Sequence, residues 1–141
     1  MTEIIRVSNF LRSVLLADAA TCAVCGLLFV AGGAFLQNLS GLPAPLIFYA
    51  GLSLFPFTAF LIYAATRKSL SKTFVWLFIG LNLLWTIDSL LLLVSGYVAP
   101  SAFGYVFVIF QAIGVLMFAN LEFIGLRKAE VVVFKDATET L

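Results

Sequence analysis

Four long apolar stretches place the strongest limit on how this chain can fold. They cover residues 13–36, 43–66, 73–95 and 102–126. Each is longer than the ~20 residues that a helix needs to cross a ~30 Å hydrocarbon core. A helix suits such a stretch because it satisfies its own backbone hydrogen bonds, which lipid cannot do. We therefore predict four membrane-spanning α-helices in one domain over residues 1–141, with a tail at 129–141.

The composition favours a membrane protein over a soluble one. Hydrophobic residues make up 63% of the 141 residues, and charged residues make up 11%. A soluble domain is roughly 45–50% apolar and about 25% charged. Four buried helices of a soluble protein are the alternative, but these stretches lack the polar face that contact with water requires.

Charge in the connecting segments predicts the orientation of the helices. The connections are short, so successive helices should run antiparallel. The first connection, QNLSGLPAP, and the third, GYVAPSA, contain no Lys or Arg. The eight basic residues lie at the two ends and in the second connection: Arg6, Arg12, Arg67, Lys68, Lys72, Arg127, Lys128 and Lys135. By the positive-inside rule, we expect an all-α, four-helix antiparallel bundle with both termini in the cytoplasm.

The ends of the chain carry weaker signals. Residues 1–12 are expected to form either a short interfacial helix or a frayed terminus. The tail combines a β-prone run, VVVF, with a polar end, and we expect it on the cytoplasmic surface or disordered. Ser71 and Ser101 are plausible N-caps of the third and fourth helices. A cleaved signal peptide is not expected, because the first stretch is too long and no clear cleavage site follows it.

The two halves of the chain are faintly alike. The run GLLFVAGG at 26–33 is similar to SLLLLVSG at 89–96. A parallel repeat of two helical hairpins would explain the similarity. Chance similarity between Leu-rich segments is the alternative.

Small and polar residues form stripes within the apolar stretches. On the first helix, Asp18, Thr21, Cys22, Cys25 and Gly26 fall on about one third of the circumference. The later helices carry similar stripes: Gly51, Thr58 and Ala65; Asn82, Trp85, Thr86 and Ser89; Gly104, Gln111, Gly114, Phe118, Glu122 and Gly125. In lipid such stripes pack against neighbouring helices, so we expect them to meet in the centre of the bundle.

The depth of the polar residues predicts two layers, at ~1.5 Å of rise per residue. Asp18 and Glu122 lie at similar depth near the cytoplasmic boundary, which predicts an inner pair if their helices touch. Asn82 should lie between the layers. Asp88 and Gln111 lie at the same depth as each other, farther from the cytoplasmic boundary, on adjacent antiparallel helices. This placement predicts an outer pair.

Carboxylates inside a membrane are costly and are candidates for function. No Lys or Arg of the chain lies within the apolar stretches near Asp88. It must be protonated, hydrogen-bonded, exposed to a water-filled cavity or paired across an oligomer interface. Trp85, one turn earlier, either packs or helps to recognise a cation or lipophilic ligand. The candidate ligand- or ion-binding residues are Asp88, Gln111, Asn82, Trp85, Asp18 and Glu122.

Several kinds of chemistry are not expected. The chain has no His and two Cys, which excludes His-based zinc sites and His-containing catalytic triads. Cys22 and Cys25 are expected to pack as small apolar residues rather than to act in redox chemistry. We assign no catalytic residue, no metal site and no cofactor. The scattered basic residues do not indicate nucleic-acid binding.

Two resemblances to known families are limited in extent. In size and helix count the chain is similar to small multidrug-resistance transporters, with Asp18 in the place of their first-helix carboxylate. WLFIGLNLLWTIDS does not match the aromatic and Gly-rich signature of that family's third helix. The short ends and dual topology of that family also differ from the tail and the one-sided charge of this chain. The run FGYVFVIFQAIGVLMFANLEFIGLRK, residues 103–128, resembles the last helix of small, uncharacterised bacterial inner-membrane proteins. This second resemblance implies the architecture and a bacterial inner (plasma) membrane location, and it implies no activity.

Three kinds of function stay open at this point. The first is an accessory or interaction subunit, or a binder of a small lipophilic ligand, whose partners are membrane lipids, a second copy of the chain or another membrane protein. The second is a proton- or cation-coupled small transporter or channel that uses Asp88 or Asp18. The third is a membrane enzyme acting on a lipid or quinone, in which the two Asp residues supply the acid–base chemistry.

Overall fold

A computed structural model describes residues 2–135 and is mainly helical. Its elements in chain order are β1 (Thr2–Arg6), α1 (Asn9–Ala31), α2 (Gly33–Ser40), α3 (Ala44–Thr66), β2 (Ser69–Ser71), α4 (Lys72–Val94), α5 (Ala102–Lys128) and β3 (Val131–Lys135). Helices α1, α3, α4 and α5 are each long and apolar enough to cross a membrane. The four long apolar helices predicted from the sequence are therefore confirmed.

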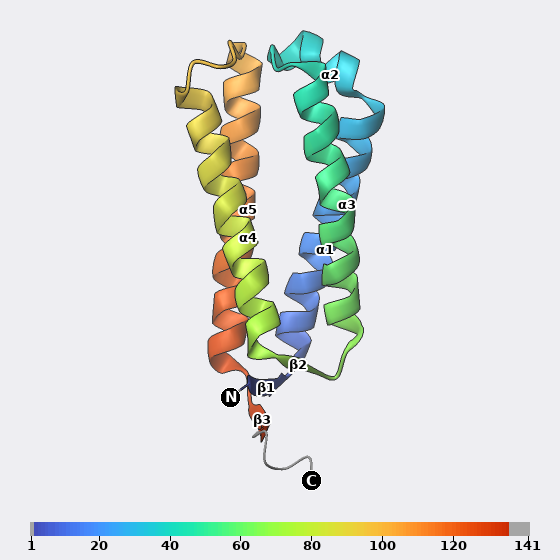
Figure 1. Ribbon diagram of the computed structural model, residues 1–141, viewed down its shortest axis with the longest axis vertical. Helices are drawn as coiled ribbons and strands as arrows, with labels where there is room; N and C mark the ends of the chain where they lie inside the picture. The colour runs from blue at the N-terminus through green and yellow to red at the C-terminus, as the bar shows by residue number, and fades with distance from the viewer. Residues whose placement is uncertain (1, 136–141) are drawn as a thin grey trace.

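The four long helices form two antiparallel hairpins (Figure 1). Helix α1 packs along α3, and α4 packs along α5. Contacts between the hairpins are sparser and lie mainly between α1 and α5 and between α2 and α5. Figure 1 shows the hairpins converging toward the end of the bundle that carries the strands. We call this the sheet end, and we call the opposite end, with α2 and residues 95–101, the loop end.

The first apolar stretch is not the single helix predicted over 13–36. Helix α1 begins earlier, after the N-cap Ser8, whose hydroxyl accepts a hydrogen bond from the Leu11 amide at 3.1 Å. It ends at Gly32, and α2 then continues to the left-handed residue Gly41, whose φ is 74°. Two consecutive glycines explain the break, because glycine is about 1 kcal/mol less favourable than alanine inside a helix.

The other helix boundaries lie within two residues of the predictions. Helices α3, α4 and α5 cover 44–66, 72–94 and 102–128, where 43–66, 73–95 and 102–126 are predicted. Both predicted N-caps are confirmed. The Ser71 hydroxyl accepts from the Thr73 amide at 3.3 Å, and the Ser101 hydroxyl accepts from the Gly104 amide at 3.1 Å.

A small antiparallel sheet of order β2-β1-β3 lies at the sheet end and was not predicted. Residues 2–6 form its central strand, so both expectations for this end, an interfacial helix and a frayed terminus, are wrong for these residues. Ile5 pairs with Leu70 on one side and Val131 on the other. Ile5 and Leu70 are buried in the apolar core, which explains why a strand is preferred here. The β-prone run of the tail forms β3, and residues 136–141 lie outside the described part.

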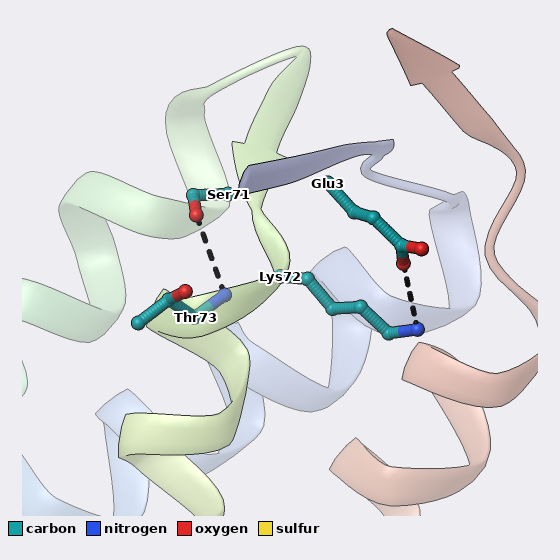
Figure 2. A network of polar contacts seen from close by, with 4 residues as sticks. All are labelled: Glu3, Ser71, Lys72 and Thr73. Atoms are coloured by element: carbon teal, nitrogen blue, oxygen red, sulfur yellow. Dashed lines mark hydrogen bonds and ion pairs between the residues drawn. The ribbon is translucent and has the colours of Figure 1, made fainter. Parts of the chain in front are cut away.

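Polar contacts fasten the sheet to the bundle. Figure 2 shows the Lys72 ammonium, at the start of α4, donating to the Glu3 carboxylate of β1 at 2.9 Å. Arg12 on α1 donates to the carbonyl oxygens of Ala65 and Arg67 at 2.9 and 3.3 Å, at the C-terminal end of α3. A cation in this place also stabilises the helix dipole. These contacts and the pairing of β1 with β2 and β3 hold the two hairpins together at the sheet end.

The outer surface of the bundle is apolar. Large side chains are exposed on all four long helices, among them Leu27, Phe60, Leu84 and Phe110. An apolar surface of this extent is unfavourable in water. Together with the four spans, it indicates a membrane protein.

Helices α1 and α3 pack most closely where two glycines face each other. A Cβ atom added to Gly51 would lie 2.5 Å from the Phe29 Cβ and 3.1 Å from the Gly26 carbonyl oxygen. A Cβ atom on Gly26 would in turn lie 3.2 Å from the Gly51 carbonyl oxygen. The approach of these two backbones therefore depends on the absence of side chains, as is usual between membrane helices.

We predict that Gly51→Leu lowers the free energy of unfolding by about 1–3 kcal/mol, because the added side chain must push α1 away from α3. Thermal unfolding of the purified protein in detergent measures the effect as a lower Tm. Gly80→Leu is the matched control, since a Cβ atom there meets nothing within 4 Å. Equal Tm values for the two variants would contradict the close packing of α1 on α3.

Candidate functional site

A buried polar cluster joins three helices near the middle of the bundle. The Asn82 side-chain nitrogen, on α4, donates to the Asp18 carboxylate of α1 at 3.0 Å and to the Glu122 carboxylate of α5 at 3.2 Å. The three residues are only 4%, 2% and 0% exposed, respectively. The predicted proximity of Asp18 and Glu122 is therefore confirmed, and Asn82 is the residue that connects them.

The remaining oxygens of this cluster differ in their contacts. The Cys22 thiol lies 3.5 Å from the second Asp18 oxygen and donates to it, a polar contact that the sequence did not predict. The second oxygen of Glu122 is buried and has no hydrogen-bond partner within the described chain. Within the same residues no Lys or Arg forms an ion pair with either carboxyl group. Two carboxyl groups that share one amide donor in a buried place form an arrangement that can hold a proton.

A cavity of about 520 Å³ lies between the two hairpins. Asp18, Cys22 and Asn82 border it on the side of the polar cluster, and Asp88 and Gln111 border it nearer the loop end. Much of the remaining wall is aromatic and consists of Trp85 and six phenylalanines: Phe29, Phe57, Phe60, Phe107, Phe110 and Phe118. A second cavity, of about 300 Å³, shares Phe29, Trp85, Asp88, Phe107 and Gln111 with the first and extends toward α2.

Exposed residues of α3 and α4 form part of the wall of the larger cavity. These two helices pack only sparsely on each other in the described chain, and Phe57 and Phe78 meet edge-to-face across them at 5.9 Å. Phe60 on α3 and Leu84 on α4 both line the cavity, yet they are 57% and 53% exposed. The cavity wall on this side is therefore partly exposed at the apolar surface of the bundle.

The predicted outer pair of Asp88 and Gln111 does not form. The Gln111 carbonyl oxygen accepts from the Trp85 indole nitrogen at 2.7 Å, and the Gln111 amide donates to the Ser89 hydroxyl at 2.9 Å. No hydrogen bond or ion pair joins Asp88 to another side chain that the structure describes. Asp88 is exposed, and it borders both cavities. Asp88 lies at the edge of the face that carries Trp85 and Ser89, which explains why these two residues reach Gln111 instead.

Gly114 also differs from its expected role in helix packing. A Cβ atom at this position meets nothing within 4 Å, and the residue lines the larger cavity. Gly125, by contrast, allows close approach, since a Cβ atom there would lie 3.0 Å from a Leu11 methyl group of α1. Of the wall phenylalanines, Phe118 belongs to the stripe predicted for the last helix. The other five were not predicted, because an apolar residue facing a cavity has the same pattern as one facing lipid.

No protein-family model, curated protein or solved structure matches this chain. The resemblance of residues 103–128 to the last helix of small bacterial inner-membrane proteins thus stays a prediction. The assignment of a function depends on the geometry of the cavity and its polar groups.

Removing the shared donor should destabilise the bundle. We predict that Asn82→Leu lowers the free energy of unfolding by about 1–3 kcal/mol, because Asp18 and Glu122 lose their common hydrogen-bond partner while still buried. The matched control is Asn120→Leu, the same substitution at an exposed position of α5. Thermal unfolding in detergent should give a lower Tm for Asn82→Leu alone. A Tm like that of the control would contradict the bridging role of Asn82.

Proposed function

We propose that this protein binds a small lipophilic ligand between its two helical hairpins. The observation that carries the proposal is the 520 Å³ cavity with an aromatic wall and few polar groups. Ligand sites in proteins typically measure about 300–1,000 Å³ and combine apolar walls with a small number of orienting polar groups. Here those groups are Asp18 and Asn82 on one side and Asp88 on the other.

The route into the cavity fits a ligand that dissolves in lipid. Because exposed apolar side chains of α3 and α4 form part of the cavity wall, such a ligand would enter sideways between these helices without passing through water. Gly114 supports the proposal because it leaves space that any larger residue would occupy.

We further propose that the chain is a multi-pass protein of a bacterial inner membrane with both termini in the cytoplasm. The support is the placement of the eight Lys and Arg residues, which lie in the segments that meet at the sheet end. Membrane lipids would surround the bundle. A second copy of the chain, or another membrane protein that it serves as an accessory subunit, would be its protein partner.

A proton- or cation-coupled transporter is the second candidate. The cluster of Asp18, Asn82 and Glu122 favours it, because a proton-holding group beside a ligand cavity is what coupled transport requires. A transporter would move its ligand across the membrane of proteoliposomes in response to a proton gradient, whereas a binder would not.

We predict that Gly114→Phe fills the cavity and reduces ligand occupancy by about tenfold or more. The probe is a neutral trifluoromethyl-phenyl diazirine, photolysed with the protein in lipid nanodiscs and mapped by peptide mass spectrometry. Label on cavity residues of α5 should fall relative to label on outward-facing residues. Gly80→Phe is the control, since Gly80 is exposed, outside both cavities, and equally free of close neighbours. Equal cavity labelling in the two variants would contradict a ligand site.

The orientation is tested by cysteine labelling in intact bacterial cells that express the chain. In a background of Cys22→Ser and Cys25→Ala, we predict that Tyr97→Cys at the loop end reacts with a membrane-impermeant maleimide. Ser69→Cys at the sheet end should react only after the cells are lysed, because the positive end stays in the cytoplasm. The reverse pattern would show that the proposed orientation is wrong.

A further inference from the structure

The chemical class of the ligand follows from the charge in the cavity. We infer that the cavity binds a lipophilic organic cation, such as an amphiphilic amine or an onium ion, with its positive charge beside Asp88. This inference depends on the proposed binding function and adds the kind of molecule that the site selects.

Asp88 differs from the other carboxyl groups of the bundle in having no partner. Asp18 accepts from Asn82 and Cys22, and Glu122 accepts from Asn82. In the part of the chain that the structure describes, no donor contacts Asp88, although it borders both cavities. A carboxylate in apolar surroundings is strongly unfavourable unless an opposite charge or a donor compensates it.

Among the side chains that the structure describes, no cation lies beside Asp88 on the cavity wall. None of the described residues that line either cavity is Lys or Arg. Lys72, the basic residue nearest to Asp88 along α4, is 16 positions away, which corresponds to about 24 Å of helix. Asp18 adds a second acidic group to the same cavity. The charge of the cavity wall therefore favours a cationic ligand and disfavours an anionic one.

Aromatic rings lie beside Asp88 in an orientation that the structure fixes. The Trp85 indole, one turn before Asp88, is held by its hydrogen bond to Gln111, and Gln111 is held by Ser89. Phe29 and Phe107 meet edge-to-face at 5.9 Å and line both cavities. Aromatic faces attract organic cations, most strongly where water is excluded. Gln111 thus acts as a positioning residue for Trp85.

An inorganic cation fits the site poorly. Hydrated metal ions such as Ca²⁺ and Mg²⁺ require six or more oxygen ligands, in part from several protein groups. Among residues 2–135 no group of three or more candidate ligands surrounds Asp88. One carboxylate among aromatic side chains instead suits a single, diffuse positive charge with an apolar body.

Two probe ions of the same shape and opposite charge test the inference. Purified full-length protein in detergent is dialysed to equilibrium against radiolabelled tetraphenylphosphonium or tetraphenylborate. We expect saturable binding of the cation and no saturable binding of the anion. Equal binding of the two ions, or saturable binding of the anion alone, would overturn the inference even if no variant folds.

Substitutions at Asp88 test whether the positive charge of the ligand binds beside this residue. Asp88→Asn should weaken tetraphenylphosphonium binding by about tenfold or more, and Asp88→Glu should keep it within a few-fold. The control Glu130→Gln removes a negative charge at an exposed position outside the cavities and should leave binding unchanged. Unchanged binding by a folded Asp88→Asn protein would overturn the role of Asp88.

The diazirine and tetraphenylphosphonium experiments together distinguish a failure of the cationic-ligand inference from a failure of the proposed binding function. If the neutral diazirine probe labels the cavity and Gly114→Phe removes that label, the binding function stands even where tetraphenylphosphonium does not bind. That pattern would reject a cationic ligand alone. Absence of both signals would reject the binding function together with the inference.

Discussion

The hydrogen bonds of Asn82 connect two helical hairpins that otherwise pack sparsely on each other. Its amide donates to one carboxylate from each hairpin, Asp18 of the first and Glu122 of the second. An apolar bundle offers no water to replace these bonds, so separating the hairpins here would leave the buried Asp18 carboxylate without its Asn82 donor. The sheet adds a second connection at one end, because β1 pairs with strands that adjoin both α4 and α5. Between the Asn82 bridge and the loop end, where Ser101 donates to the carbonyl oxygens of Leu39 and Ser40, the hairpins enclose the cavity.

The polar residues that line or adjoin the cavity differ in whether they connect helices. Asn82 and Gln111 use their amides to connect helices, which is a structural use of polarity. Asp88 lies outside these networks within the described chain and borders the cavity beside Trp85. A carboxyl group inside a membrane that does not hold the fold together is a candidate for binding another molecule. This contrast is the basis for assigning a ligand to the cavity and a positive charge to the ligand.

Hydropathy and helix periodicity were sufficient to predict the four long helices, two of their N-caps and the meeting of Asp18 with Glu122. These features follow from helix geometry along one segment at a time. The sheet could not be predicted, because β1 depends on pairing with β3, which lies about 130 residues later in the chain. The break at Gly32 and the hydrogen-bond partner of Gln111 depend on the rotation of each helix about its axis and on local backbone angles, which sequence spacing does not fix. The cavity could not be predicted for a related reason. A phenylalanine that faces lipid, a packed core or a cavity has the same sequence pattern in each case.

Solid-state NMR of the protein in lipid bilayers tests the central claim most directly. Dipolar couplings from the Asn82 side-chain nitrogen to the carboxyl carbons of Asp18 and Glu122 report whether the two hairpins meet through this amide. The structure predicts couplings to both carbons, in agreement with nitrogen–oxygen distances of 3.0 and 3.2 Å. Absence of coupling to the Asp18 carboxyl carbon would contradict the bridge between the hairpins, and with it the cavity and the ligand assigned to it.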